Sequence, residues 1–262
     1  MSRFITLASS SSGNAAFVGT GQYGVLIDAG ISAKRIKTAM ADAGLDPAFI
    51  KAIFITHEHD DHIKGLNVLA AQLKVPVYAT RGTMAGLFDA NVLDGRFPTE
   101  LLTDKPVTVG DMRISHFYTS HDSRQSCGYR IELPDRTVGI ATDTGYATPE
   151  MMAGLSECDL VLLESNYDDD MLMNGFYPPY LKARIRSDVG HLSNDASAEA
   201  ARTLLDLNVR RFVLGHLSQH NNTPALALAA HRAAFAAYGA KENVDYELLA
   251  APVEAMANYM VF

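Results

Sequence analysis

The feature that most constrains this chain is the run His57-Glu58-His59-Asp60-Asp61-His62, which places metal-binding side-chain types side by side. It follows an apolar segment, residues 51–56, and precedes an amphipathic one, residues 63–73, so we expect a turn between a strand and a helix. Imidazole suits borderline cations such as Zn²⁺, Fe²⁺ and Mn²⁺, and carboxylates shift the preference towards harder ions. A solvated polar turn rarely concentrates ligand types in this way. The run therefore predicts a transition-metal site.

One ion would rarely use every ligand in this run. His57 and His59 can face one cation, whereas Asp61 and His62, which are displaced along the turn, can face a second one about 3.5–4 Å away. The local spacing thus favours a site for two metal ions.

Length and composition favour one soluble globular domain spanning residues 1–262. The chain is 48% hydrophobic and has a mean hydropathy of zero, without an apolar run of the roughly 18 residues that span a bilayer. We expect a cytoplasmic protein without a membrane partner, because the first residues lack the apolar core of a secretory signal. Its two cysteines, Cys127 and Cys158, are expected to be reduced.

Strand-like and helical segments alternate along the chain. The strand-like segments are residues 4–8, 23–27, 52–56, 75–78, 107–109, 113–118, 128–133, 137–141, 160–164 and 211–215. The clearest helical segments are residues 33–43, 63–73, 195–207 and 224–238. This pattern predicts an α/β (α+β) protein, a four-layer αββα sandwich of two mixed β-sheets with outer helices.

The metal-binding run resembles the H-x-H-x-D-H signature of the metallo-β-lactamase fold superfamily. Further candidate ligands occur in the order that this resemblance implies, each after a strand-like segment: His121, Asp143 and His216. His220 is a nearby competitor of His216. The resemblance implies two divalent ions, zinc or manganese with iron as a further option. It also implies their ligands: His57, His59 and His121 for one ion, Asp61, His62 and His216 for the other, with Asp143 bridging them.

Physical chemistry agrees with that division. A carboxylate between two dications neutralises their repulsion, and the ions together lower the pKa of a bridging water towards about 7. We therefore expect a bridging hydroxide to be the nucleophile and the ions to stabilise the charge that develops on the attacked group.

Three further segments resemble the WalJ (YycJ-like) group of bacterial metallohydrolases: residues 7–14, residues 178–185 together with 190–194, and residues 214–224. This resemblance implies a 5′-to-3′ exonuclease that acts on DNA ends, and for some members a link to mismatch repair. Tyr167 stands where many relatives have histidine, so no extra ligand or acid is expected there.

The predicted catalytic residues are Asp61 and His191. His191 resembles a histidine of tRNA-maturing nucleases that contacts the scissile phosphate and can donate a proton to the leaving oxygen. It precedes a helix start, whose free N–H groups can bind phosphate. The predicted phosphate contacts are Ser12, Asn14, Lys182, Arg184, Arg186, Ser193 and Asn194. A solvated helix face at residues 182–186 and a simple hairpin turn at residues 9–14 are the alternatives.

Three other functions compete with a nuclease. A hydrolase of small esters, thioesters or cyclic phosphates could use the same site, although the basic stretch and His191 favour nucleic acid. A di-iron oxygen or nitric oxide reductase would resemble H-x-E-x-D, whereas this chain has His59 at the second position. A binding module without catalysis would have lost ligands.

The net charge of −8 argues against binding DNA by bulk charge but allows a local basic channel. His116 and His231 are expected to be structural, and the sequence is compatible with a homodimer.

Overall fold

The computed structural model describes residues 1–256 and 260–261. Its first sheet has the strand order β14-β1-β2-β3-β4-β5-β6. These strands are β1 (Arg3–Ser10), β2 (Gly13–Gly19), β3 (Gly24–Ile27), β4 (Ile50–Phe54), β5 (Val77–Ala79), β6 (Thr99–Leu101) and β14 (Met260–Val261). Pairing is antiparallel from β14 to β3 and parallel from β3 to β6, so the sheet is mixed.

The second sheet has the order β13-β12-β11-β10-β9-β8-β7. Its strands are β7 (Val107–Val109), β8 (Met112–Tyr118), β9 (Cys127–Glu132), β10 (Thr137–Ala141), β11 (Leu160–Glu164), β12 (Arg211–Gly215) and β13 (Glu247–Ala250). This sheet is also mixed, because β10 to β13 pair in parallel whereas β7 to β10 pair antiparallel.

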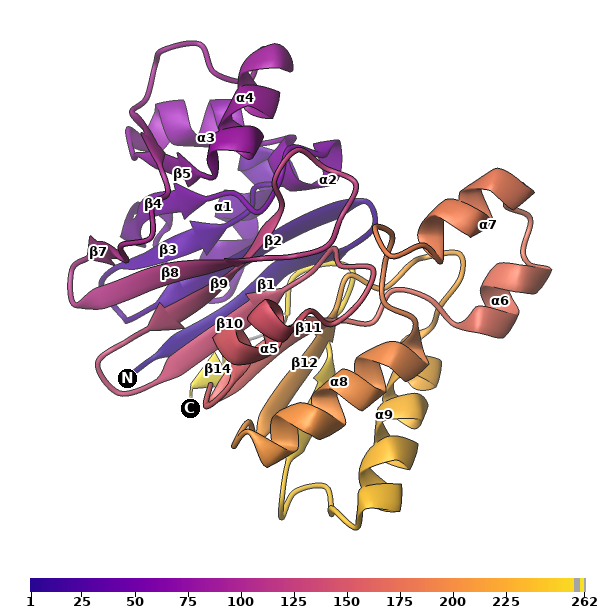
Figure 1. Ribbon diagram of the computed structural model, residues 1–262. Coiled ribbons are helices and arrows are strands. Elements are labelled where there is room, and N and C mark those ends of the chain that lie inside the picture. The colour runs from indigo at the N-terminus through magenta and orange to yellow at the C-terminus, as the bar shows by residue number, and fades with distance from the viewer. Residues whose placement is uncertain (257–259, 262) are drawn as a thin grey trace.

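Apolar side chains hold these sheets together as the two inner layers of a four-layer sandwich (Figure 1). A buried cluster that includes Phe4, Phe54 and Tyr129 joins the facing surfaces of the sheets. The outer face of the first sheet packs on α1 (Ala33–Asp42), α3 (Leu66–Leu73) and α4 (Arg81–Asp89). The outer face of the second packs on α5 (Pro149–Leu155), α8 (Asn194–Asp206) and α9 (Pro224–Tyr238). The predicted αββα sandwich is therefore confirmed.

One predicted helix is interrupted in the structure. Residues 63–73 were expected to form a single helix, but the structure has the short α2 (Asp60–Ile63) and then α3. The chain breaks at Gly65, where a Cβ atom would lie 2.1 Å from the carbonyl oxygen of Ile31. The Gly65 N–H also donates to the carbonyl of Ala29. This close approach explains the break and places Asp61 and His62 in a helix turn.

Other elements lie outside the predicted segments. They are β2, β6, β13, β14, α4, α5, the 3₁₀ helix η1 (Pro47–Phe49), α6 (Asp169–Asn174) and α7 (Pro179–Ile185). Figure 1 shows α6 and α7 projecting from one end of the sandwich, away from the outer helix layers. Cys127 and Cys158 are free, as predicted, and both are buried. Within the described part of the chain, no helix combines the length and apolar character needed to cross a membrane.

Candidate metal centre

Three histidines from two elements form the first ligand set. His57 and His59 follow β4, and His121 follows β8 on the other sheet. The Nε2 atom of His57 lies 3.1 Å from Nδ1 of His59, which lies 3.3 Å from Nε2 of His121. Asp143 Oδ1 lies 4.0 Å from the His57 nitrogen and 3.7 Å from the His121 nitrogen. The ligand atoms of the three histidines thus lie within 4.8 Å of one another.

A second set lies on the other side of Asp143. The Oδ2 atom of Asp61 is 3.4 Å from Nε2 of both His62 and His216. Asp143 Oδ2 lies 3.2 Å from the same His62 nitrogen. Asp143 Oδ1 is also 3.4 Å from Nδ1 of His216. The Asp143 carboxylate therefore lies between the two ligand sets, which is the placement that a bridging carboxylate needs.

Most of these histidines are fixed by a hydrogen bond from the second ring nitrogen to a buried oxygen. His57 Nδ1 lies 3.0 Å from Thr56 Oγ1, and His62 Nδ1 lies 2.8 Å from Asp28 Oδ2. His121 Nδ1 lies 3.0 Å from the carbonyl oxygen of Gly190, and His216 Nδ1 lies 2.8 Å from Glu164 Oε1. A carbonyl or carboxylate oxygen can only accept, and the Thr56 hydroxyl already donates its hydrogen to Asp28 Oδ2. The facing nitrogen therefore carries the proton, and the other nitrogen is the one that can bind a cation. The arrangement therefore selects the tautomer that a metal ligand requires.

Asp28 and Glu164 were missed by the sequence analysis. Asp28 directly follows the apolar strand β3, and Glu164 is the last residue of β11, where both side chains are buried. A charged residue at the end of an apolar strand was the available signal. Their partners are distant in sequence, so the contacts themselves could not be read from local spacing.

Three residues at this edge adopt left-handed backbone conformations, with φ of 60° at Asp28, 58° at Asp143 and 55° at His216. Such conformations cost a residue other than glycine about 1–2 kcal/mol. Each of these residues follows a strand, and its left-handed conformation turns the backbone away from the direction of that strand. The side chain thereby points in a different direction from those of the strand. Gly30 permits a further close approach, since a Cβ there would lie 1.6 Å from the carbonyl oxygen of Asp61. Strain gathered here is typical of a functional site.

Buried carboxylates make the electrostatic field of this cluster favourable to positive charge. Burial alone would lower the pKa of His216, but Asp143, Asp61 and Glu164 raise it to about 10. Burial alone would raise the pKa of Asp143, yet His216, His62 and His57 hold it well below its usual value. The acids thus stay ionised and attract protons to nearby imidazoles, and a divalent cation can take the place of those protons.

One further observation indicates that these residues suit a pair of metal ions. Asp143 Oδ2 is buried and accepts no hydrogen bond of acceptable geometry. An unsatisfied buried carboxylate oxygen is costly unless a cation completes its surroundings. The mixed imidazole and carboxylate donors suit zinc, manganese or iron.

A cavity of about 200 Å³ opens beside these ligands. It is lined by Ser11, His59, Asp61, His121, Asp143, Asn166, Tyr177, Leu181, Arg184, Ile185, His191, His216 and Ser218. The Nδ1 atom of His191 lies 2.8 Å from Glu164 Oε1 and 3.8 Å from Asp143 Oδ1. His191 therefore lies next to the ligand sets, with Nε2 as the nitrogen left for a substrate.

Three basic residues lie in or directly after α7, and they differ in their surroundings. Arg184 lines the cavity and forms a two-pronged ion pair with Asp122, with Nη2 2.8 Å from Oδ1. Lys182 instead donates to the carbonyls of Met173 and Gly175 at 2.7 and 2.8 Å. Arg186 pairs with Asp169 at 3.1 Å. Only Arg184 among these three has a place at the cavity.

The other predicted phosphate contacts are engaged within the protein. Asn14 Nδ2 lies 3.1 Å from His62 Nε2, and Ser12 Oγ accepts from Gln219 at 2.7 Å. Ser193 caps α8 by accepting from the Ala196 N–H, and Asn194 is buried against Ser165 and Asn222. None of these four side chains belongs to the cavity lining given above.

The remaining histidines lie outside the two ligand sets. His231 is buried in α9, where Nδ1 donates to the carbonyl of Ala227 at 2.8 Å. His116 is half-buried in β8. His220 is exposed and packs beside Phe176, whereas His216 lies within the second set.

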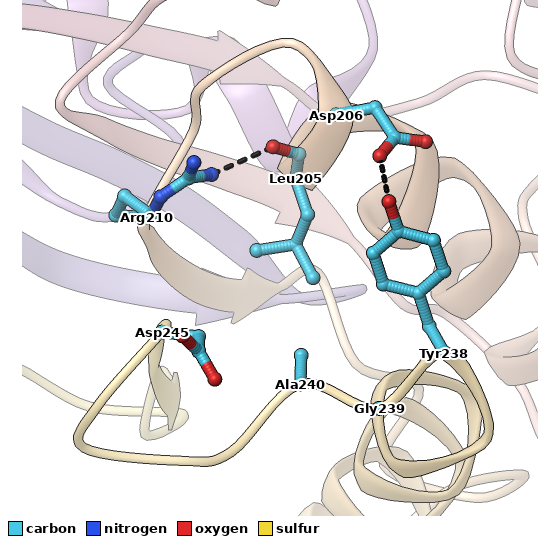
Figure 2. A pocket seen from close by; sticks show the side chains of 7 residues that line it. All are labelled: Leu205, Asp206, Arg210, Tyr238, Gly239, Ala240 and Asp245. Carbon is cyan, nitrogen blue, oxygen red and sulfur yellow. Dashed lines mark hydrogen bonds between the residues drawn. The ribbon is translucent and has the colours of Figure 1, made fainter.

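A hollow of about 380 Å³ exceeds the metal-site cavity in volume but differs from it in chemistry (Figure 2). It lies where α8 and α9 end and is lined by Leu205, Asp206, Arg210, Tyr238, Gly239, Ala240 and Asp245. Arg210 donates to the carbonyl of Leu205, and the Tyr238 hydroxyl donates to Asp206 (Figure 2). Asp245 accepts from the backbone N–H of Lys241, which lies outside this lining, and no histidine lines the hollow.

Known proteins resemble this chain in sequence and in fold. Residues 23–217 match the family described as the beta-lactamase superfamily domain. Exodeoxyribonuclease WalJ of Streptococcus pneumoniae serotype 2 is 38% identical over 228 residues, which cover 86% of this chain and 85% of the relative. Exodeoxyribonuclease YycJ of Bacillus anthracis is 37% identical over the same shares of each chain.

Among solved structures, the zinc-bound PqqB of Methylobacterium extorquens shares the fold with a TM-score of 0.72. The two chains are 18% identical, over 97% of this chain and 99% of PqqB. The resemblance predicted from the metal-binding run is therefore confirmed. The chain belongs to the beta-lactamase superfamily and, within it, to the family of the WalJ and YycJ exodeoxyribonucleases.

Proposed function

We propose that this protein is a two-metal phosphodiesterase that removes nucleotides from the 5′ end of DNA. The observation that carries the proposal is Asp143, whose carboxylate lies between the two ligand sets and lines a cavity that His191 also lines. The names of the WalJ and YycJ relatives support DNA as the substrate. The 5′-to-3′ direction comes from the resemblance stated above.

We propose that His57, His59 and His121 hold one divalent cation, that Asp61, His62 and His216 hold the other, and that Asp143 contacts both. When bound, such a pair activates a water at neutral pH and stabilises negative charge on the attacked phosphate. Zinc and manganese are the proposed metals, and iron has the same donor requirements.

The protein's own groups orient the substrate and move the proton. Glu164 accepts the Nδ1 proton of His191 and so holds its ring in one orientation, with Nε2 directed to a substrate atom. A protonated His191 would donate from Nε2 to the oxygen that leaves phosphorus. Arg184, which lines the cavity, would contact a non-bridging phosphate oxygen in exchange for its partner Asp122.

The proposed unit of function is one domain formed by residues 1–262. The cluster between the sheets supports it, because this cluster joins β-strands from both halves of the chain. A homodimer and a cytoplasmic location stay predictions from the sequence.

The test is digestion of end-labelled duplex DNA by protein loaded with Mn²⁺ or Zn²⁺. Substrates with a 5′-phosphate and a 5′-hydroxyl are compared, and Asp143→Ala serves as the control. Stepwise loss of nucleotides from the 5′ end, absent in the control, is the expected result. Failure to cut DNA or RNA with both metals bound would instead favour a hydrolase of small esters, thioesters or cyclic phosphates.

A further inference from the structure

Three rings form a cluster at the rim of the metal-site cavity: Phe176, Tyr177 and His220. The ring centroids of Phe176 and Tyr177 are 5.0 Å apart, and those of Phe176 and His220 are 5.3 Å apart. The Tyr177 and His220 centroids are separated by 6.0 Å. All three pairs meet edge to face, which is a favourable arrangement for aromatic groups. We call these three residues the aromatic rim.

The aromatic rim runs from the cavity wall out to solvent. Tyr177 lines the cavity, whereas Phe176 is 76% exposed. A phenylalanine this exposed leaves an apolar surface in water, and here that surface continues into the candidate active site. The position is therefore suited to a flat, partly apolar group that belongs to the substrate.

Hydrogen bonds hold both sides of the aromatic rim in place. On one side, the Lys182 ammonium donates to the carbonyl of Gly175, directly before Phe176. On the other side, Gln219, directly before His220, donates to Ser12 Oγ at 2.7 Å. A surface that is already ordered loses little conformational entropy when a ligand covers it.

We propose that the aromatic rim stacks against a nucleobase near the 5′ end of the DNA strand whose phosphate enters the metal-site cavity. The inference rests on the proposed function and adds a base-binding subsite to it. A nucleotide fits because it joins a flat π surface, its base, to a phosphate, and the rim joins ring surface to a cavity of about 200 Å³ lined by polar side chains. Stacking tolerates every base, so this subsite accepts any sequence.

The proposal separates two parts of substrate recognition. The ligand sets, His191 and Arg184 act on the phosphate, whereas the aromatic rim acts on a base and leaves the reacting atoms untouched. Loss of the rim should therefore raise KM for DNA and leave kcat nearly constant. Removal of the base from the substrate should have the same effect as removal of the ring from the protein.

The experiment measures kcat and KM for the metal-loaded protein on oligonucleotides that carry one abasic site at successive positions from the 5′ end. At one position, the abasic site should raise the KM of the wild-type protein by about tenfold. Phe176→Ala should show a similar rise on intact DNA and no further rise with the abasic site. Phe176→Trp should restore the wild-type KM.

Phe88→Ala is the matched control, because Phe88 is 69% exposed on α4 and belongs to a different part of the surface. Equal KM values for Phe176→Ala and Phe88→Ala would overturn the inference, and so would an abasic penalty that survives in Phe176→Ala. Absence of DNA cleavage by the wild-type protein would overturn the proposed function as well, and this distinguishes the two failures.

Discussion

Oε1 of Glu164 lies 2.8 Å from Nδ1 of His191, although the Glu164 side chain is fully buried. The same oxygen is 2.8 Å from Nδ1 of His216, and Oε2 accepts from the backbone N–H groups of Thr144 and Leu192. Burial alone would raise the pKa of Glu164, but His191 and His216 lower it to about 2. An ionised Glu164 therefore links the proposed proton donor to a proposed metal ligand.

His191→Ala should keep both metal ions and lose rate. The side chain is outside the two proposed ligand sets, so metal content should stay unchanged, whereas kcat on DNA should fall roughly 10²–10⁴-fold through loss of the proton donor. Metal analysis and single-turnover cleavage provide the two measurements.

A substrate with an activated leaving group tests the assigned role of His191. A p-nitrophenyl phosphodiester needs no proton on its leaving oxygen, so His191→Ala should cleave it with a much smaller loss. An equal loss on both substrates would show that His191 acts in binding rather than in proton transfer.

Asp143→Ala should lose metal and activity together. The variant removes the carboxylate that lies between the two ligand sets, and Asp61 and the histidines would be left to hold two cations against their mutual repulsion. We expect fewer than two bound ions and more than about a 100-fold loss in kcat. Metal analysis after dialysis and cleavage of labelled DNA give the readouts, with circular dichroism as the control for folding. Activity retained in a metal-free variant would contradict the mechanism.

Arg184→Ala should weaken DNA binding more than removal of the neighbouring cation Arg186. We expect KM to rise about tenfold and the slope of log KM against log salt concentration to fall by about one, as for one lost phosphate contact. Arg186→Ala is the matched control, because the charge of Arg186 is engaged by Asp169. Equal effects of the two substitutions would show that charge, rather than placement, governs this surface.

The candidate ligand residues could be named from the sequence because their signal is local. His57, His59, Asp61 and His62 lie in one strand-to-helix turn, and parallel strands bring the ends of β10 and β12 to the same edge of a sheet. The sequence also predicted the layer order, since alternating apolar strands and amphipathic helices leave few ways to bury both.

The candidate phosphate contacts were harder to predict, because they depend on where each side chain points in the folded protein. A basic run at residues 182–186 indicates that positive charge is present. Tertiary contacts decide that Lys182 donates to a backbone carbonyl and that Arg184 lines the cavity. Glu164 was missed for the same reason, as its partners His191 and His216 come from later parts of the chain. Residues that meet only after folding leave no spacing to detect.

His231 provides a test of stability that is independent of catalysis. Its imidazole is buried in α9, and this burial lowers its pKa to about 4 despite the hydrogen bond to Ala227. The unfolded chain has the ordinary pKa of about 6.5, so it takes up a proton before the folded protein does. The free energy of unfolding should therefore fall as the pH drops from about 6.5 towards 4, and this contribution is constant outside that window.

Comparison of wild type with His231→Gln isolates this effect, because the site histidines titrate in both proteins. Between pH 7.5 and pH 5 the wild-type protein should lose about 2 kcal/mol more of its unfolding free energy than the variant does. Urea denaturation at the two pH values, with the same metal content in both proteins, measures the difference. Equal pH dependence would mean that His231 keeps an ordinary pKa in the folded protein, through water that reaches its ring or through a proton shared with Ser197, whose Oγ lies 3.1 Å from Nε2.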